Sequence, residues 1–254
     1  MNQLKQIIVS LLLLLSFSEL EAQIETYAQG ELNFLKLTNG LNIIIKNNTP
    51  SPTIEVSFHI RFGSIYEQDS FSGISNVLEH IMSNKIQRHL SNSRNILNNK
   101  SCSFNSFVTT EQSVFKFRVS SSYVKNCFDL MVDSVYNSVI RDLELRYAIE
   151  SIQEELSQAS SVRQRMDSTM LRKLYRVEFD RLNVTGNPAK FKNFNQASLQ
   201  KHKARYYKSD NTICSVNGSF QTQSIINDFT PSASRLLKGI TTRKALQRLL
   251  ISSQ

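Results

Sequence analysis

The chain has 254 residues, of which 40% are hydrophobic and 20% are charged, and its formal net charge at pH 7 is +9. This length and composition suit a folded chain with a substantial core, and they exclude wholesale disorder. Seven glycines and four prolines exclude a collagen-like or low-complexity architecture, and three cysteines exclude a disulfide scaffold. The basic charge makes nucleic acid or an anionic surface the first partner to consider.

The first 22 residues have the pattern of a secretory signal peptide. Lys5 gives a weakly positive start, residues 7–15 form a nearly unbroken apolar run, and Ala22 offers a small residue at the cleavage site. This run is too short to cross a bilayer, although an uncleaved membrane anchor is the main alternative, because Leu20 stands where a small residue is preferred. We therefore expect an exported protein, periplasmic or secreted, with no stable membrane span after cleavage.

Export argues against a nucleic-acid partner. The first 22 residues carry one lysine and two glutamates, so the rest of the chain has a net charge of +10. Its lysines and arginines are spread along the chain rather than gathered in one block, and tryptophan is absent. We therefore expect a solvated basic surface and no nucleic acid as a partner.

The three cysteines, Cys102, Cys127 and Cys214, are widely spaced. In an oxidising compartment one pair could form a disulfide, and the odd count would leave at least one thiol unpaired. We expect buried thiols.

The first half of the chain alternates between strand and helix patterns. Residues 32–46 hold two apolar runs on either side of an Asn-Gly dipeptide, which is typical of a tight hairpin turn. In residues 53–62 apolar and polar side chains alternate, which predicts a strand with one buried face. Residues 73–90 change to a helical period, and residues 113–119 alternate again as a strand.

The second half is mostly helical. Its predicted elements are, in order, a helix along the apolar stripe over 124–139, one long helix or two in tandem over 142–176, a loop over 182–195, a short helix over 196–207, a strand over 211–217, and a segment over 220–254 that favours helix and then becomes basic and irregular. Hairpin connections dominate the whole order, so we expect an α+β fold, with a largely antiparallel sheet and helices packed on one face. We divide the chain into a signal peptide over 1–22, one folded domain over 23–230, and a basic C-terminal tail or truncated remainder over 231–254.

The helix predicted over 73–90 carries the candidate chemistry. Asn76 and His80 are four residues apart and share one helix face, and Glu79 lies beside them, away from the apolar stripe. Two nitrogen ligands at this spacing, with a carboxylate that activates a water, are typical of a zinc site, and in the inverted motif H-x-x-E-H the glutamate precedes the second histidine. Here asparagine replaces the first histidine. Taken alone, N-x-x-E-H is more often a polar helix face than a metal site.

Five segments, in order, resemble the insulinase/pitrilysin family of zinc metallopeptidases and its mitochondrial-processing-peptidase-like domain. They are the hairpin at 37–41, the strand that ends in Phe62-Gly63-Ser64 before Glu67, the motif helix at 73–82, the segment 104–110, and the stretch from Arg205 to Phe220. The resemblance covers about residues 32–230 and implies a single metallopeptidase-like lobe with zinc as cofactor. It implies Glu79 as general base and His80 as a zinc ligand, with Asn76 at the first ligand position. It also implies that the segment 104–110 is the edge strand that binds peptide, through Asn105 and Phe107.

The family's third metal ligand is a glutamate on a later helix, and residues 153–156 resemble that stretch. Glu155 lies 75 residues after His80, close to the family's usual separation, and Glu154 is the alternative one residue away. A supporting glutamate that the family tends to carry two turns earlier is replaced here by Ala148. Without the resemblance, both glutamates would be interpreted as ordinary solvated helix residues.

Three departures from the family predict lost catalysis. The amide oxygen of Asn76 is a poorer zinc ligand than imidazole, so we expect weak or absent zinc binding. Ala148 removes a supporting carboxylate, a loss that costs roughly 10–100-fold in metal affinity or activity. The family also pairs two domains or subunits around the peptide, whereas this chain holds one, so we expect a second lobe or a homologous catalytic subunit as its partner.

We therefore expect a catalytically degenerate member of the family, which binds peptide or serves as a non-catalytic partner subunit. The first alternative is an active zinc-dependent endopeptidase with Asn76, His80 and Glu155 as ligands, because asparagine can occasionally bind a metal. Glu79 would then be its base. The second alternative is an exported basic protein that binds anionic envelope components.

Overall fold

The computed structural model describes residues 25–29, 32–47, 51–92, 102–158, 170 and 183–239. The predicted signal peptide over 1–22 and most of the predicted basic tail lie outside these residues, so both stay predictions. None of the helices in the described ranges is long and apolar enough to cross a membrane.

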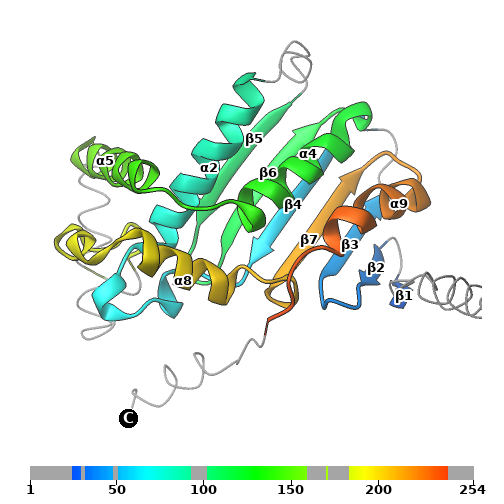
Figure 1. Cartoon of the computed structure of the whole chain (residues 1–254). Helices are drawn as coiled ribbons and strands as arrows, with labels where there is room; N and C mark the ends of the chain where they lie inside the picture. Colours follow the sequence, from blue (N-terminus) through cyan, green and yellow to red (C-terminus); the bar gives the residue numbers. More distant parts are fainter. Residues whose placement is uncertain are drawn as a thin grey trace, which may run out of the picture.

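A seven-stranded sheet forms the body of the described chain, in the order β1-β2-β3-β7-β4-β6-β5 (Figure 1). Its strands are β1 (Glu25–Gln29), β2 (Leu32–Lys36), β3 (Asn42–Asn47), β4 (Ile54–Ile60), β5 (Ser103–Val108), β6 (Ser113–Val119) and β7 (Thr212–Gly218). Five of the six neighbouring pairs are antiparallel, and only β3 and β7 run parallel. The predicted largely antiparallel sheet is thus confirmed, although β1 has no counterpart among the predicted elements.

The helices lie together on one face of this sheet (Figure 1). They are α2 (Ile74–Asn92), α4 (Val124–Val132), α5 (Asp142–Gln158), α8 (Gln196–Tyr206) and α9 (Thr222–Ala233). Short 3-10 turns join them at η1 (Ser64–Tyr66), η2 (Asp69–Phe71), η3 (Ser121–Tyr123), η5 (Pro188–Asn193) and η6 (Ser209–Asn211), and η4 (Asp133–Asn137) is a π-helical turn. This layered arrangement confirms the α+β fold class.

The hairpin between β2 and β3 forms at the Asn-Gly dipeptide as predicted. Gly40 adopts φ 87°, a left-handed conformation that glycine tolerates without steric cost. Its backbone N–H donates to the carbonyl of Leu37 at 2.8 Å, which closes the turn. The side-chain amide of Asn39 donates to the carbonyls of Ala233 and Leu236 at 2.8 and 3.1 Å, so the hairpin is tied to the end of α9.

Aromatic side chains fill the space between the sheet and the helices. Phe58 of β4 meets Phe128 of α4 edge to face, with ring centroids 5.4 Å apart. Phe128 in turn stacks on Phe229 of α9, with centroids 3.8 Å apart. All three rings are buried. Strand alternation therefore buries the predicted face of residues 53–62 against the helix layer.

The helix predicted over 124–139 ends before its apolar stripe does. After α4 the chain widens into the π-helical turn η4, and Ser138 is extended, with ψ 143°. Val139 is 62% exposed, so its prediction as part of the buried stripe is wrong. The five-residue spacing of a π turn shifts the residues that follow it off the face that a 3.6-residue period predicts.

Other predictions are confirmed in part. The helical region predicted over 142–176 begins with α5, and most of it beyond Gln158 lies outside the described residues. The loop predicted over 182–195 contains η5. The predicted domain end at 230 falls inside α9, and the division of the chain into segments stays a prediction.

Candidate functional site

A cleft of about 520 Å³ opens between α2, α5 and the edge strand β5. It is lined by all six residues that the sequence singles out as site residues: Asn76, Glu79, His80, Asn105, Phe107 and Glu155. Most of its other lining residues are polar: Ser83, Asn84, Gln87, Ser106 and Ser151, with Phe104 and Val108. The fold thus brings segments more than 70 residues apart in sequence to one hollow, while the roles of these residues stay predictions.

Buried Glu67 holds the start of α2. Its carboxylate accepts hydrogen bonds from the backbone N–H groups of Gly73 at 2.6 Å and Ser75 at 2.8 Å, and from the Ser75 hydroxyl. These bonds satisfy donors that have no partner within the helix, at the end where the helix dipole favours negative charge. Burial raises the pKa of Glu67 to about 7, and the three hydrogen bonds act in the opposite direction. The helix that carries Asn76 and His80 is therefore fixed at its first turn.

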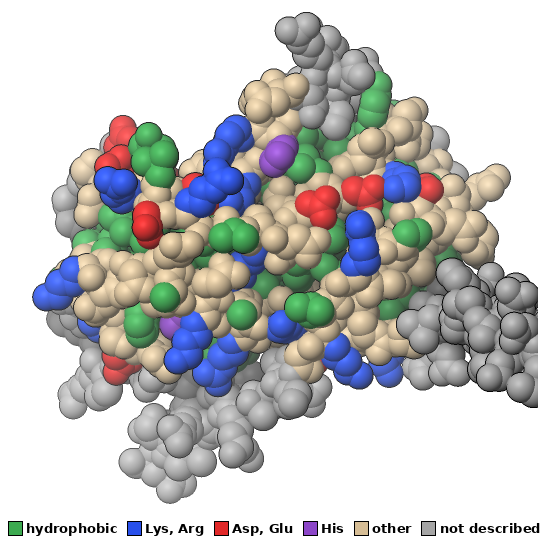
Figure 2. Space-filling model, in the orientation of Figure 1, with side chains coloured by type: hydrophobic (Ala, Val, Ile, Leu, Met, Phe, Trp, Pro, Cys, Tyr) green, Lys and Arg blue, Asp and Glu red, His purple; other side chains and the backbone are tan. Residues whose placement is uncertain are grey.

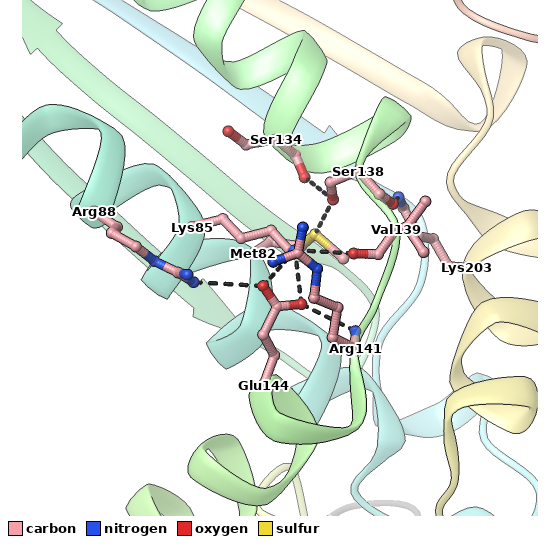
Figure 3. Close-up of polar contacts among 9 residues, drawn as sticks. All are labelled: Met82, Lys85, Arg88, Ser134, Ser138, Val139, Arg141, Glu144 and Lys203. Atoms are coloured by element: carbon pink, nitrogen blue, oxygen red, sulfur yellow. Dashed lines mark hydrogen bonds and ion pairs between the residues drawn. The ribbon is translucent and has the colours of Figure 1, made fainter. Parts of the chain in front are cut away.

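An ion pair joins α2 to α5, as Figure 3 shows. Lys85 Nζ lies 2.7 Å from both carboxylate oxygens of Glu144 and 2.9 Å from the carbonyl oxygen of Val139. Lys203 of α8 donates to the neighbouring carbonyl of Ser138 (Figure 3). Burial lowers the pKa of Lys203 to about 8, and the charge of Lys85 acts in the same direction. These bonds set α5, which carries Glu155, in place against α2.

His80 and Glu155 meet between the two helices. His80 Nε2 lies 3.7 Å from Glu155 Oε2. Two ligands of one tetrahedral zinc, each at about 2.1 Å from the ion, are about 3.4 Å apart. The spacing of this pair therefore suits two ligands of a single ion. The side chain of His80 is 15% exposed and that of Glu155 is 59% exposed, so the pair is open to the cleft.

Glu79 is buried beside this pair, with its Oε2 3.9 Å from His80 Nε2. Burial raises the pKa of Glu79, whereas a hydrogen bond from the Ser106 hydroxyl and the charge of His80 lower it, and the charge of Glu155 raises it. A carboxylate with a raised pKa is a better proton acceptor, which suits a general base.

Ser106 lines the cleft but was not among the predicted site residues. Burial alternates along β5, so Ser106 lies on the half-buried side, whereas Asn105 and Phe107 lie on the exposed side, Phe107 being 42% exposed. Ser106 therefore lies on the side of β5 that affects Glu79, whereas the peptide-binding role of Asn105 and Phe107 stays a prediction. The two-residue period of the strand is the signal that would have identified it.

β5 is also the last strand of the sheet. It pairs with β6 on one side, and no strand of the described ranges pairs with it on the other. A strand with an unpaired side can accept an added strand through its backbone N–H and C=O groups. This edge runs along the cleft.

Two positions on α5 refine the predicted third ligand. Glu155 lines the cleft, and Glu154 is not among its lining residues, so the structure distinguishes the two candidates by position. Ala148 is fully buried in the core. A methyl group therefore stands where the family resemblance predicted a supporting carboxylate.

The residues present do not fit a fully held catalytic zinc. Such an ion takes three protein ligands and a water. Across the part of the chain that the structure describes, no three His, Cys, Asp or Glu side chains are grouped to hold a metal ion. His80 and Glu155 supply two donors, and Asn76, four residues before His80, supplies a neutral amide in place of a third.

Residues 42–183, more than half of the chain, match the family model described as insulinase (peptidase family M16). The chain belongs to this family. The M16 chain is 24% identical over 195 residues to the uncharacterized zinc protease YmxG of Bacillus subtilis, covering 75% of this chain and 47% of that protein. It is 20% identical over 221 residues to the probable mitochondrial-processing peptidase subunit beta of Arabidopsis thaliana, covering 85% of this chain and 41% of that protein.

The fold of this M16 chain matches about a quarter of a longer protein, with 26% of that chain covered. It superposes on the first half of the periplasmic protease PqqL from Escherichia coli with a TM-score of 0.75 and 17% sequence identity, covering 86% of this chain and 50% of that chain. The chain spans about half the length of the curated relatives it matches. The predicted family and the single metallopeptidase-like lobe are therefore confirmed.

Proposed function

We propose that this M16 domain is a catalytically degenerate lobe, which binds peptide and acts as the non-catalytic partner of a homologous catalytic subunit or second lobe. The observation that carries the proposal is Asn76, which lines the cleft at the position of the first histidine of the inverted zinc motif. With His80 and Glu155 as the two remaining donors, zinc binding is weak or absent. Glu79 then has no firmly held water to activate.

Peptide binding is supported by the edge strand. An extended peptide would add to the unpaired side of β5, where main-chain hydrogen bonds give affinity and side chains give selectivity. Asn105 and Phe107 are exposed on this strand and line the cleft, so they are the side chains we assign to peptide contact. Phe107 offers an apolar surface for a peptide side chain.

A partner is supported by the relatives. Several of them are named as subunits, among them the beta subunit above and a probable mitochondrial-processing peptidase subunit alpha-1 of Arabidopsis thaliana, which is 24% identical over 131 residues. PqqL is described as periplasmic, which agrees with the export that the N-terminal pattern predicts. On the face seen in Figure 2, lysines and arginines are spread over several separate groups, and acidic side chains lie mostly in the upper half of the view.

The proposal is tested by restoring the missing ligand. The unmodified full chain is expected to bind zinc substoichiometrically and to bind an unstructured quenched peptide without cutting it. Asn76→His should raise zinc affinity by at least about tenfold, because it completes three protein ligands. Gln87→His, on the same helix and cleft but about 10 Å along the helix from His80, is the matched control and should leave zinc affinity unchanged.

The readouts are the zinc content after equilibrium dialysis and the fluorescence of the quenched peptide. Chelator-sensitive cleavage by the unmodified chain would refute the proposal and favour the active endopeptidase. If Asn76→His binds zinc but still cuts no peptide, activity requires a second lobe or partner subunit, which supports the partner role. If Asn76→His gains no zinc, the assignment of Asn76 to the first ligand position is wrong.

A further inference from the structure

A second, smaller hollow of about 210 Å³ lies beside the cleft. It is lined by Glu55 of β4, Ser103 and Asn105 of β5, and Lys116 and Arg118 of β6. Along each strand these side chains alternate with more deeply buried ones, so they lie on the face of the sheet away from the aromatic core. Asn105 also lines the cleft, so the two hollows meet at the edge strand.

The strand register sets two cations directly behind the edge strand. Arg118 lies opposite Ser103, and Lys116 lies opposite Asn105. The side chains of Ser103 and Asn105 are short, so they leave room for the hollow above β5. Neighbouring strands are about 4.8 Å apart, so a peptide added to the unpaired side of β5 would lie about 10 Å from β6. A long basic side chain of β6 and an acidic side chain of the peptide can therefore meet above β5.

The hollow carries a surplus of positive charge. Lys116 Nζ lies 3.7 Å and Arg118 Nη2 lies 3.2 Å from the same oxygen, Glu55 Oε2. Two cations thus share one carboxylate, which leaves the three side chains with a net charge of +1. The side chains of Lys116 and Arg118 are 35% and 62% exposed, and exposed ion pairs of this kind contribute little to stability. Both cations can therefore turn toward a second carboxylate at the edge of the sheet at small cost.

We propose that Lys116 and Arg118 select acidic peptides, by binding an aspartate or glutamate side chain of an extended peptide that adds to β5. The inference rests on the proposed peptide-binding function and names the class of peptide that this site takes. Side chains of an added strand alternate between the two faces of the sheet, so those on one side enter the cleft and those on the other enter the hollow. Charge complementarity at the hollow favours an acidic residue there over a neutral or basic one.

The test measures the binding of three short dye-labelled peptides to the full chain by fluorescence anisotropy, with a chelator present so that binding alone is measured. In the peptides threonine alternates with glutamate, glutamine or lysine, so a register shift of one residue can always place the tested side chains over the hollow. The glutamate peptide should bind at least about threefold more tightly than the glutamine peptide, and the lysine peptide should bind most weakly. The difference should shrink as sodium chloride is added, because salt screens exposed charges.

Substitutions separate the hollow from the overall basic charge of the chain. Lys116→Gln and Arg118→Gln should each reduce the preference for the glutamate peptide and leave the affinity for the glutamine peptide unchanged. Lys125→Gln is the matched control, because this lysine is 50% exposed and pairs with Asp129 at 2.6 Å, but lies on α4 in the helix layer. It removes the same charge and should keep the preference. Glu55→Gln should strengthen binding of the glutamate peptide, because it removes the carboxylate that competes for the two cations.

The outcomes distinguish this inference from the peptide-binding function. Equal binding of the glutamate and glutamine peptides would overturn the acidic selection and leave peptide binding intact. So would a loss of preference in Lys125→Gln as large as in Lys116→Gln, or weaker binding of the glutamate peptide to Glu55→Gln. If none of the three peptides binds, the peptide-binding function is wrong and this inference falls with it.

Discussion

Replacing Glu67 with glutamine tests how strongly this buried carboxylate links stability to pH. Burial raises the pKa of Glu67 to about 7, from the ordinary 4.5. Between these values the folded chain keeps a proton that the unfolded chain has released, so the free energy of unfolding contributed by Glu67 falls as pH rises. At about 1.36 kcal/mol for each pKa unit, the loss is about 3 kcal/mol across this range.

The assay is urea denaturation of the unmodified chain and of Glu67→Gln at a series of pH values between about 4 and 8. The variant keeps the size of the side chain but cannot titrate at this position, and its NH₂ group faces the backbone donors of α2, which lowers its stability at every pH. The difference between the two chains should therefore shrink by about 3 kcal/mol as pH rises. Equal pH dependence in both chains would refute the reasoning. A difference that grows with pH would show that the hydrogen bonds, and not burial, control the pKa of Glu67.

Two further substitutions probe how α2 is held. Lys85→Met leaves the Glu144 carboxylate without its main partner. The free energy of unfolding, measured by urea denaturation, should therefore fall by about 2 kcal/mol, and a fall of less than about 0.5 kcal/mol would contradict this prediction. In Gly186→Ala the new Cβ would lie 2.2 Å from the Cα of Gly73, and the φ of residue 186, +82°, is unfavourable for alanine. The Tm should therefore fall by about 6–12 °C. Gly239→Ala, whose Cβ approaches mainly a lysine side chain, is the control with the smaller loss, and equal losses would contradict the steric argument.

Local patterns in the sequence were sufficient to predict most of the strands and helices. The Asn-Gly hairpin, the alternating strands and the motif helix depend on neighbouring residues, so their patterns predict β2, β3, β4, β6 and α2 directly. The π-helical turn after α4 was not predicted, because the helical period of apolar residues does not indicate where a helix widens. The parallel pairing of β3 with β7 joins strands that are far apart in sequence, and no local pattern encodes it.

In the candidate site, too, local features could be predicted from the sequence and long-range contacts could not. The spacing of Asn76, Glu79 and His80 on one helix was readable, because a helix fixes which side chains share a face. The approach of Glu155 to His80 needed the family resemblance, since it depends on how two helices pack. The hydrogen bonds of Glu67 to the start of α2 came only from the structure, because they cross an irregular turn.

The position of β7 has a consequence for the order in which the protein can be made. β7 lies between β3 and β4, and among the described strands it is the one that joins β1-β2-β3 to β4-β6-β5. During synthesis the ladder from β3 to β4 can therefore form only after Thr212–Gly218 has left the ribosome. The last of the seven described strands to be made is the one that joins the sheet, so the sheet is completed late.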